Sequence, residues 1–357
     1  NIRMSKSDSP IVMSEYQYYE FQAIDRPLSE KEQAEVGSFS SRAEVTSTRA
    51  VFIYNYSDFP GDSLKILQKY FDAMLYLTNW GTKQLAFRLP RSLVDAKALA
   101  VYRYQDLIST SVTKNHIILD IGLHEEEGSW VEGEGWLSSL AMLRRDILLG
   151  DYRALYLAWL KAISIYDEIE EYGDPLEPPI PAGLKKLSAP LKSLVEFFEI
   201  DDDLVAVASE ASAANKGAVA LDIERQIVKL SEQERLAFLV KAARGDPQVN
   251  VQLLKKLKEL ASNQRERSAP SLTPRRKAAE LLTAAAARFD RRKEQERQKA
   301  DKARIKRLNA MAQQEPEMWK QVFDLIKTKQ TKAYDQADQA SHRTARFGAT
   351  FPPVGGI

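Results

Sequence analysis

The sequence predicts an α+β fold: an N-terminal mixed β/α sandwich domain, followed by an all-helical region and a long charged helix. Residues 13–130 contain short segments rich in aromatic and β-branched residues, a composition typical of strands. Residues 131–260 carry apolar side chains at helical spacing. From residue 275 the chain becomes rich in Ala, Arg, Lys, Glu and Gln, which favour a solvent-exposed helix.

Two helix signals interrupt the expected strands of the first region. Ser29 begins a capping box with Glu32, which predicts a short helix toward Phe39. Asp62 is placed to cap a second helix, in which apolar residues near helical spacing extend to Leu77. The expected strands cover residues 15–23, 45–55 and 83–89, and an expected hairpin pairs residues 108–112 with 116–123.

The second half reads as a series of helices. Trp159 lies in a broad apolar stripe over residues 155–166, so we expect it to be buried. Five prolines in residues 174–190 predict a stiff connector. The charged helix is expected over residues 275–313, and Pro316 is expected to start a last amphipathic helix, because proline suits the first helical position.

These patterns predict a division of the chain into six parts. The ends show no helical or strand periodicity and are expected to be disordered. The expected parts are a disordered leader at 1–12, an α+β domain at 13–130, a helical domain at 131–260, a linker at 261–274, the charged and amphipathic helices at 275–335, and a disordered tail at 336–357.

Composition excludes several kinds of chemistry. The chain has no cysteine and three histidines, which rules out thiolate catalysis and cysteine-based zinc or iron–sulfur sites, and we expect no metal or cofactor. No apolar run has the length of a membrane span, so we expect a cytoplasmic protein that does not enter a membrane. No catalytic motif occurs, although acid–base catalysis by Asp, Glu, Lys or Tyr leaves no sequence signature. The sequence therefore favours a non-enzymatic protein and leaves enzymatic activity open.

Charge is distributed unevenly. Residues 120–174 contain 13 acidic and 4 basic residues, and residues 265–307 contain 15 basic and 6 acidic ones. Such asymmetry indicates that the two regions contact each other or face different partners. The acidic loop at 124–136 could hold a divalent cation, but it lacks the alternating ligands of a calcium loop, so a solvated loop or a docking surface is the better interpretation.

The leading hypothesis is a non-enzymatic protein-interaction or adaptor protein that docks a protein partner through its charged helix. The first alternative is a nucleic-acid-binding protein that uses the basic helix at 275–307. The second is an enzyme without a recognisable motif in the N-terminal domain. The oligomeric state stays open. The candidate partner-binding residues are Arg288, Arg291, Arg292, Lys293, Trp319 and Phe323.

Three short segments carry a resemblance. Residues 18–28 read Tyr-Tyr-Glu-Phe-Gln-Ala-Ile-Asp-Arg-Pro-Leu, residues 70–73 read Tyr-Phe-Asp-Ala, and residues 79–82 read Asn-Trp-Gly-Thr. This pattern resembles a group of uncharacterised bacterial proteins over roughly residues 13–334. The resemblance implies a bacterial protein and no activity or site residue.

The C-terminal stretch carries a second resemblance. Residues 319–335 are similar to a C-terminal stretch of some bacterial SWIM zinc-finger proteins. The cysteines of that zinc finger are absent here, so the resemblance implies neither zinc nor nucleic-acid binding.

Overall fold

The computed structural model describes residues 15–55, 59–124, 132–165, 173–213, 223–246, 248–262 and 275–327. Contacts between residues divide the chain into two units, 1–286 and 287–357. The first unit contains the sheet and all helices up to the start of α13, and the second contains the remainder of α13 (Ala278–Lys327).

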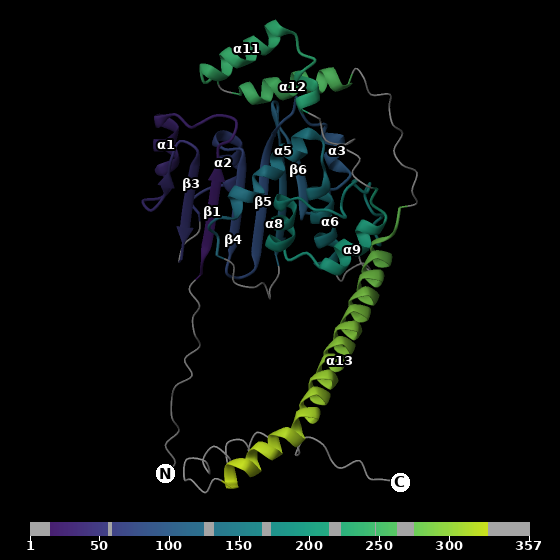
Figure 1. The fold of residues 1–357 in the computed structure, drawn as a ribbon. Coiled ribbons are helices and arrows are strands. Elements are labelled where there is room, and N and C mark those ends of the chain that lie inside the picture. Colours follow the sequence, from purple (N-terminus) through teal and green to yellow (C-terminus); the bar gives the residue numbers. More distant parts are fainter. Residues whose placement is uncertain are drawn as a thin grey trace. The chain divides into compact units, whose positions relative to one another are not determined.

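An antiparallel seven-stranded sheet in the order β2-β3-β1-β4-β5-β7-β6 forms the centre of the first unit (Figure 1). Aromatic residues stabilise its middle, where Tyr19 of β1 lies opposite Phe52 of β3 and Tyr76 of β4. The strands are β1 (Gln17–Gln22), β2 (Glu44–Val45), β3 (Arg49–Tyr54), β4 (Ala73–Thr78), β5 (Thr82–Pro90), β6 (Ile108–Val112) and β7 (His116–His124).

The two faces of the sheet belong to two different cores, because successive side chains of a strand point to opposite faces. Phe21 and Phe52 pack with α1 (Glu30–Gly37) and α2 (Ser63–Tyr70) in the smaller core. Tyr18 and Leu75 belong to the larger core, which they share with the helices that follow the sheet in sequence. The sheet and those helices are therefore one packed body.

The helices of the larger core are arranged around α6, which is buried continuously from Ala154 to Ile163. Its burial on every side explains why its sequence is apolar around the whole helix. The helices of this part are α3 (Ala96–Ala100), α4 (Trp136–Leu140), α5 (Met142–Leu149), α6 (Arg153–Ile165), α8 (Ala189–Phe197) and α9 (Asp202–Glu210).

Three further helices, α10 (Ile223–Ile227), α11 (Glu232–Ala243) and α12 (Val249–Ser262), pack around a small separate cluster that contains Leu230 and Leu257. They lie at one end of the sheet (Figure 1). A capping box at Ser231 starts α11, as the sequence predicts.

The structure confirms the α+β class and many of the predicted elements, and it corrects two of them. The helix predicted from Asp62 to Leu77 ends at Tyr70, and Ala73–Thr78 is the central strand β4. A strand that is buried on both faces has a continuous apolar sequence, which resembles a helical stripe when it directly follows a helix. The sequence also predicts a new helix at Pro316, whereas α13 runs through this position, because a proline inside a long helix can kink it without ending it.

The first two turns of α13 belong to the first unit, since Ala278, Leu281 and Ala285 are buried in the larger core. The six parts expected from the sequence stay a prediction, and residues 1–12 and 336–357 lie outside the described residues. No helix among the described residues is long and apolar enough to cross a membrane.

We predict that Trp159→Ala lowers the free energy of unfolding by about 3–5 kcal/mol, because Trp159 is 2% exposed in the centre of α6 and its loss leaves a cavity. Urea denaturation followed by circular dichroism measures this. Val228→Ala is the matched control, because Val228 is 74% exposed and should change stability by less than about 0.5 kcal/mol. A cost below about 1 kcal/mol for Trp159→Ala would contradict the packing of α6.

Candidate functional site

A buried cluster of four charged side chains lies beside one end of the sheet. Asp72 precedes β4 and is hydrogen-bonded to Arg88 of β5, with Nη2 at 2.9 Å and Nε at 3.2 Å from Oδ1. Its other oxygen accepts from the backbone N–H groups of Ile24 at 2.7 Å and Asp25 at 2.8 Å. Asp72 thus connects the segment after β1, the start of β4 and the end of β5.

Arg144 of α5 completes the cluster from the helical side of the sheet. Its two terminal nitrogens donate to the two carboxylate oxygens of Asp25 at 3.0 and 2.6 Å, a bidentate arrangement. Its Nε donates to the carbonyl oxygen of Arg88 at 2.8 Å, and one terminal nitrogen lies 3.4 Å from Asp72 Oδ1. The four side chains are buried, the most exposed being Arg88 at 9%.

The cluster compensates its own charge, with two carboxylates for two guanidinium groups. Burial raises the pKa of Asp72, but the charges of Arg144 and Arg88 and the donated backbone hydrogen bonds outweigh it and hold this pKa below its ordinary value. Asp72 is therefore ionised at neutral pH, which is the state that its four donors require.

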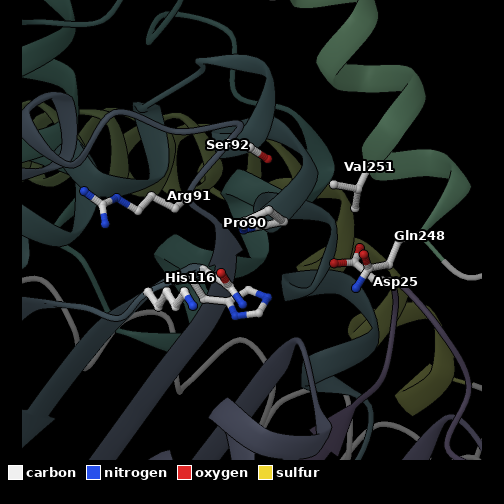
Figure 2. Close-up of a pocket in the computed structure, with 9 residues that line it drawn as sticks. Asp25, Pro90, Arg91, Ser92, His116, Gln248 and Val251 are labelled. Carbon is white, nitrogen blue, oxygen red and sulfur yellow. The ribbon is translucent and has the colours of Figure 1, made fainter.

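A cavity of about 490 Å³ lies against this cluster (Figure 2). The wall is contributed by the end of β5, the turn between β6 and β7, the loop after β1 and the start of α12. The lining residues are Asp25, Pro90, Arg91, Ser92, Lys114, Asn115, His116, Gln248 and Val251.

The position of α12 over the cavity is fixed by polar contacts to the sheet end. The N–H of Gln248 donates to the carbonyl oxygen of Asp25 at 3.2 Å, and Asn250 Nδ2 donates to Asp25 Oδ1 at 3.3 Å. Lys258 Nζ donates to the carbonyl oxygen of Leu93. The same aspartate, Asp25, therefore contacts α5 through Arg144 and α12 through Asn250.

His116, the first residue of β7, lies in the middle of the cavity wall (Figure 2). Burial lowers its pKa, as does the nearby charge of Arg88, while Asp72 and Asp25 act in the opposite direction. A lowered pKa means a neutral imidazole at neutral pH, with one nitrogen able to donate and the other able to accept a hydrogen bond.

The arrangement is suited to binding a polar ligand. The wall presents a guanidinium group, an ammonium group, a neutral imidazole and several amide and hydroxyl groups, all of which can bind oxyanions. Within the described residues, no group of three or more His, Asp or Glu side chains is placed to hold a metal ion. The volume lies in the range of small-molecule sites.

The candidate partner-binding residues of the sequence lie elsewhere, on the part of α13 that belongs to the second unit. Arg288, Arg291, Arg292 and Lys293 are exposed there, and Phe323 is 58% exposed. The side chain of Trp319 and residues 125–131 of the acidic loop lie outside what the structure describes. The role of these residues in partner binding stays a prediction.

Sequence reasoning missed the residues of the cluster and of the cavity. One local signal was present: Arg88 stands inside the otherwise apolar strand segment Leu85-Ala-Phe-Arg-Leu89, and a buried strand contains a charge only if that charge is compensated. No comparable signal marks Arg144, which is followed by the exposed Arg145 in a helix with mixed polarity.

Neither a protein-family model, nor a curated protein, nor a solved structure matches this chain. A function for it can therefore be inferred only from the geometry and chemistry of its own residues.

We predict that Arg144→Met lowers the free energy of unfolding by about 3–5 kcal/mol, because it leaves the buried carboxylates of Asp25 and Asp72 with a single guanidinium group. Chemical denaturation at neutral pH measures the loss. Arg145→Met is the control, since Arg145 is the exposed neighbour on the same helix and should change stability by less than about 0.5 kcal/mol. Equal effects of the two substitutions would contradict the cluster.

Proposed function

We propose that this chain is a nucleic-acid-binding protein that contacts a phosphate backbone through one face of α13. The supporting observation is the arrangement of charge on the helix between residues 287 and 310, which contain ten basic and four acidic residues. At about 100° per residue, six of the basic residues fall within an arc of about 100°. This set, the basic face, consists of Arg288, Arg291, Arg292, Lys299, Lys302 and Lys306.

Acidic residues are largely excluded from the basic face. Asp290, Glu294 and Asp301 project from the opposite side of the helix, and only Glu296 lies near the edge of the basic face. Charges that alternate in the sequence are thus separated in space. In the linear sequence, acidic residues alternate with the basic ones and argue against nucleic-acid binding. On the helix most of them lie on the opposite side, so this argument does not apply to the basic face.

The dimensions and exposure of the basic face fit an extended polyanion. All six side chains are exposed, and the face extends for about 27 Å from Arg288 to Lys306 at about 1.5 Å per residue. Duplex DNA presents about one negative charge per 1.7 Å of its axis, so a row of cations of this length meets many phosphates. Gln295 lies on the same face and adds a neutral hydrogen-bond donor.

The absence of apolar residues from the basic face favours nucleic acid over a protein groove. A helix that docks in a protein groove uses apolar anchors at helical spacing, and a helix that lies on a membrane needs an apolar face. The six cations and Gln295 leave no such anchor between Arg288 and Lys306 on this side. Phosphate contacts require only cations and hydrogen-bond donors.

The root of α13 is fixed firmly within the first unit. Glu177 is fully buried and accepts from Arg276 Nε at 2.9 Å and Nη2 at 2.8 Å, and also from the hydroxyl of Tyr156. Asp174 accepts from the N–H of Ala279 at 3.1 Å and so caps the first turn. These contacts determine where the helix begins.

A protein partner is the second candidate, in keeping with an adaptor role. It is favoured by Phe323 and Ile326, two apolar side chains three positions apart near the end of α13, which are 58% and 39% exposed. Exposed apolar residues at this spacing are the kind of anchor that a helix offers to a groove. This candidate uses a different part of the helix from the basic face.

The test compares two triple variants with the same change of charge. We predict that Arg291→Gln, Arg292→Gln and Lys299→Gln together weaken binding to a fluorescein-labelled mixed-sequence duplex and flatten the slope of log K against log salt by about three units, one for each lost phosphate contact. Fluorescence anisotropy over a salt series measures affinity and slope. Duplex DNA and duplex RNA are tested in parallel.

The control variant carries Lys293→Gln, Arg297→Gln and Arg304→Gln, which lie on the other side of the helix. The test set removes the ion pair of Arg292 with Glu296, and the control set removes that of Arg297 with Glu294. Circular dichroism of both triples checks that the helix content is unchanged. The control should change the slope by less than about one unit. Equal effects of both triples, or no binding by the wild type at low salt, would overturn the proposal. In that case, loss of binding to a protein partner in the Phe323→Ala variant would support the second candidate, an adaptor role.

A further inference from the structure

The cavity beside the ion cluster combines two cationic side chains that no described carboxylate neutralises. Arg91 and Lys114 both line it, and neither forms a side-chain hydrogen bond or an ion pair with any residue that the structure describes. The N–H of Arg91 donates to the carbonyl oxygen of Asn115 at 2.9 Å, which fixes the two cation-bearing segments side by side. Both side chains are exposed and line the same cavity, so both are accessible to an anion that enters it.

The single carboxylate of the lining is already occupied. Asp25 accepts two hydrogen bonds from Arg144 and one from Asn250, so its charge is balanced within the buried cluster. In Figure 2, Asp25 and Gln248 stand on one side of the cavity and Arg91 on the other, with His116 and Pro90 between them. The wall therefore carries a net charge of about +2 from Arg91 and Lys114, because the cluster behind it is neutral and His116 is uncharged at neutral pH.

The uncharged groups of the wall add directed hydrogen bonds. His116 can donate from one ring nitrogen, and Ser92, Asn115 and Gln248 contribute hydroxyl and amide groups. Three separate segments of the chain supply these groups, and Asp25, from a fourth segment of the wall, contacts Arg144 of α5 and both Gln248 and Asn250 at the start of α12. The site is thus assembled by the fold rather than by one flexible loop.

We propose that this cavity binds a small ligand that carries a doubly charged oxyanion group, with Arg91 and Lys114 as the charge partners and His116 as a hydrogen-bond donor. Two positive charges match a dianion, and the volume of about 490 Å³ is in the range of sites for small molecules. A phosphate monoester and a dicarboxylate share this chemistry. The site is independent of the basic face of α13, so either proposal can fail without the other.

Isothermal titration calorimetry of the full chain with inorganic phosphate and with succinate, at constant ionic strength set with chloride, tests the site. We expect one of the two probes to bind, and Arg91→Gln combined with Lys114→Gln to weaken that binding by at least about tenfold. Preference for phosphate indicates a phosphorylated ligand, and preference for succinate indicates a dicarboxylate. Single His116→Ala should weaken binding less than the double variant, because it removes a hydrogen bond and no charge.

The control is Arg42→Gln combined with Lys97→Gln, which removes the same charge from two exposed positions that do not line the cavity. It should leave the affinity for the bound probe within about twofold of the wild type, since exposed charges at a distance are screened by salt. Circular dichroism confirms that both double variants are folded. The absence of binding of either probe to the folded wild type, or equal loss in both double variants, would overturn the site.

Discussion

The ion cluster around Asp72 is the interaction on which the arrangement of the first unit depends. Apolar packing on the two faces of the sheet is strong but not directional, and it would tolerate small slips of one layer over another. The carboxylate of Asp72 is directional, because it accepts at once from two backbone N–H groups after β1 and from Arg88 of β5. Arg144 then connects the same group to α5. The sheet and its helical layer are thereby held in one relative position.

The same cluster determines where the cavity lies. A buried carboxylate that is balanced by a guanidinium group contributes little net charge, so the charge of the wall is set by the residues outside the cluster. Asp25 is shared between Arg144 and Asn250, and this places α12 across the end of the sheet. Arg91 and Lys114 are consequently left facing a cavity whose carboxylate is already engaged. Because Asp25 pairs with Arg144 and Asn250, it does not neutralise Arg91 or Lys114 in the same wall.

The sequence predicted those parts of the fold that depend on neighbouring residues. The capping boxes at Ser29 and Ser231 are present, and the hairpin of β6 and β7 has the predicted turn. The strand Ala73–Thr78 was missed because its burial depends on β1 and β5, which pair with it from both sides. Its apolar sequence alone does not distinguish a buried strand from a helix.

The candidate site was less predictable than the fold, for a similar reason. The partners in the ion cluster are separated by up to 119 residues, and no periodic pattern connects residues at such distances. Arg88 within a strand was a usable signal that a buried partner exists, but it did not identify Asp72. The basic face of α13 is the opposite case: its residues are local, and helical geometry alone gathers them once the helix is known to be continuous.

Like charges are gathered on one surface both on the basic face of α13 and in the wall of the cavity. Arg288 with Arg292, and Lys302 with Lys306, are like-charged pairs four positions apart, a spacing that by itself costs a helix about 0.2–0.5 kcal/mol per pair. Arg292 is also ion-paired with Glu296 at 3.1 Å. Arg91 and Lys114 likewise share one cavity wall without a described counter-charge. Both proposals therefore rest on the same premise, which is that cations gathered on one exposed surface attract an anionic partner.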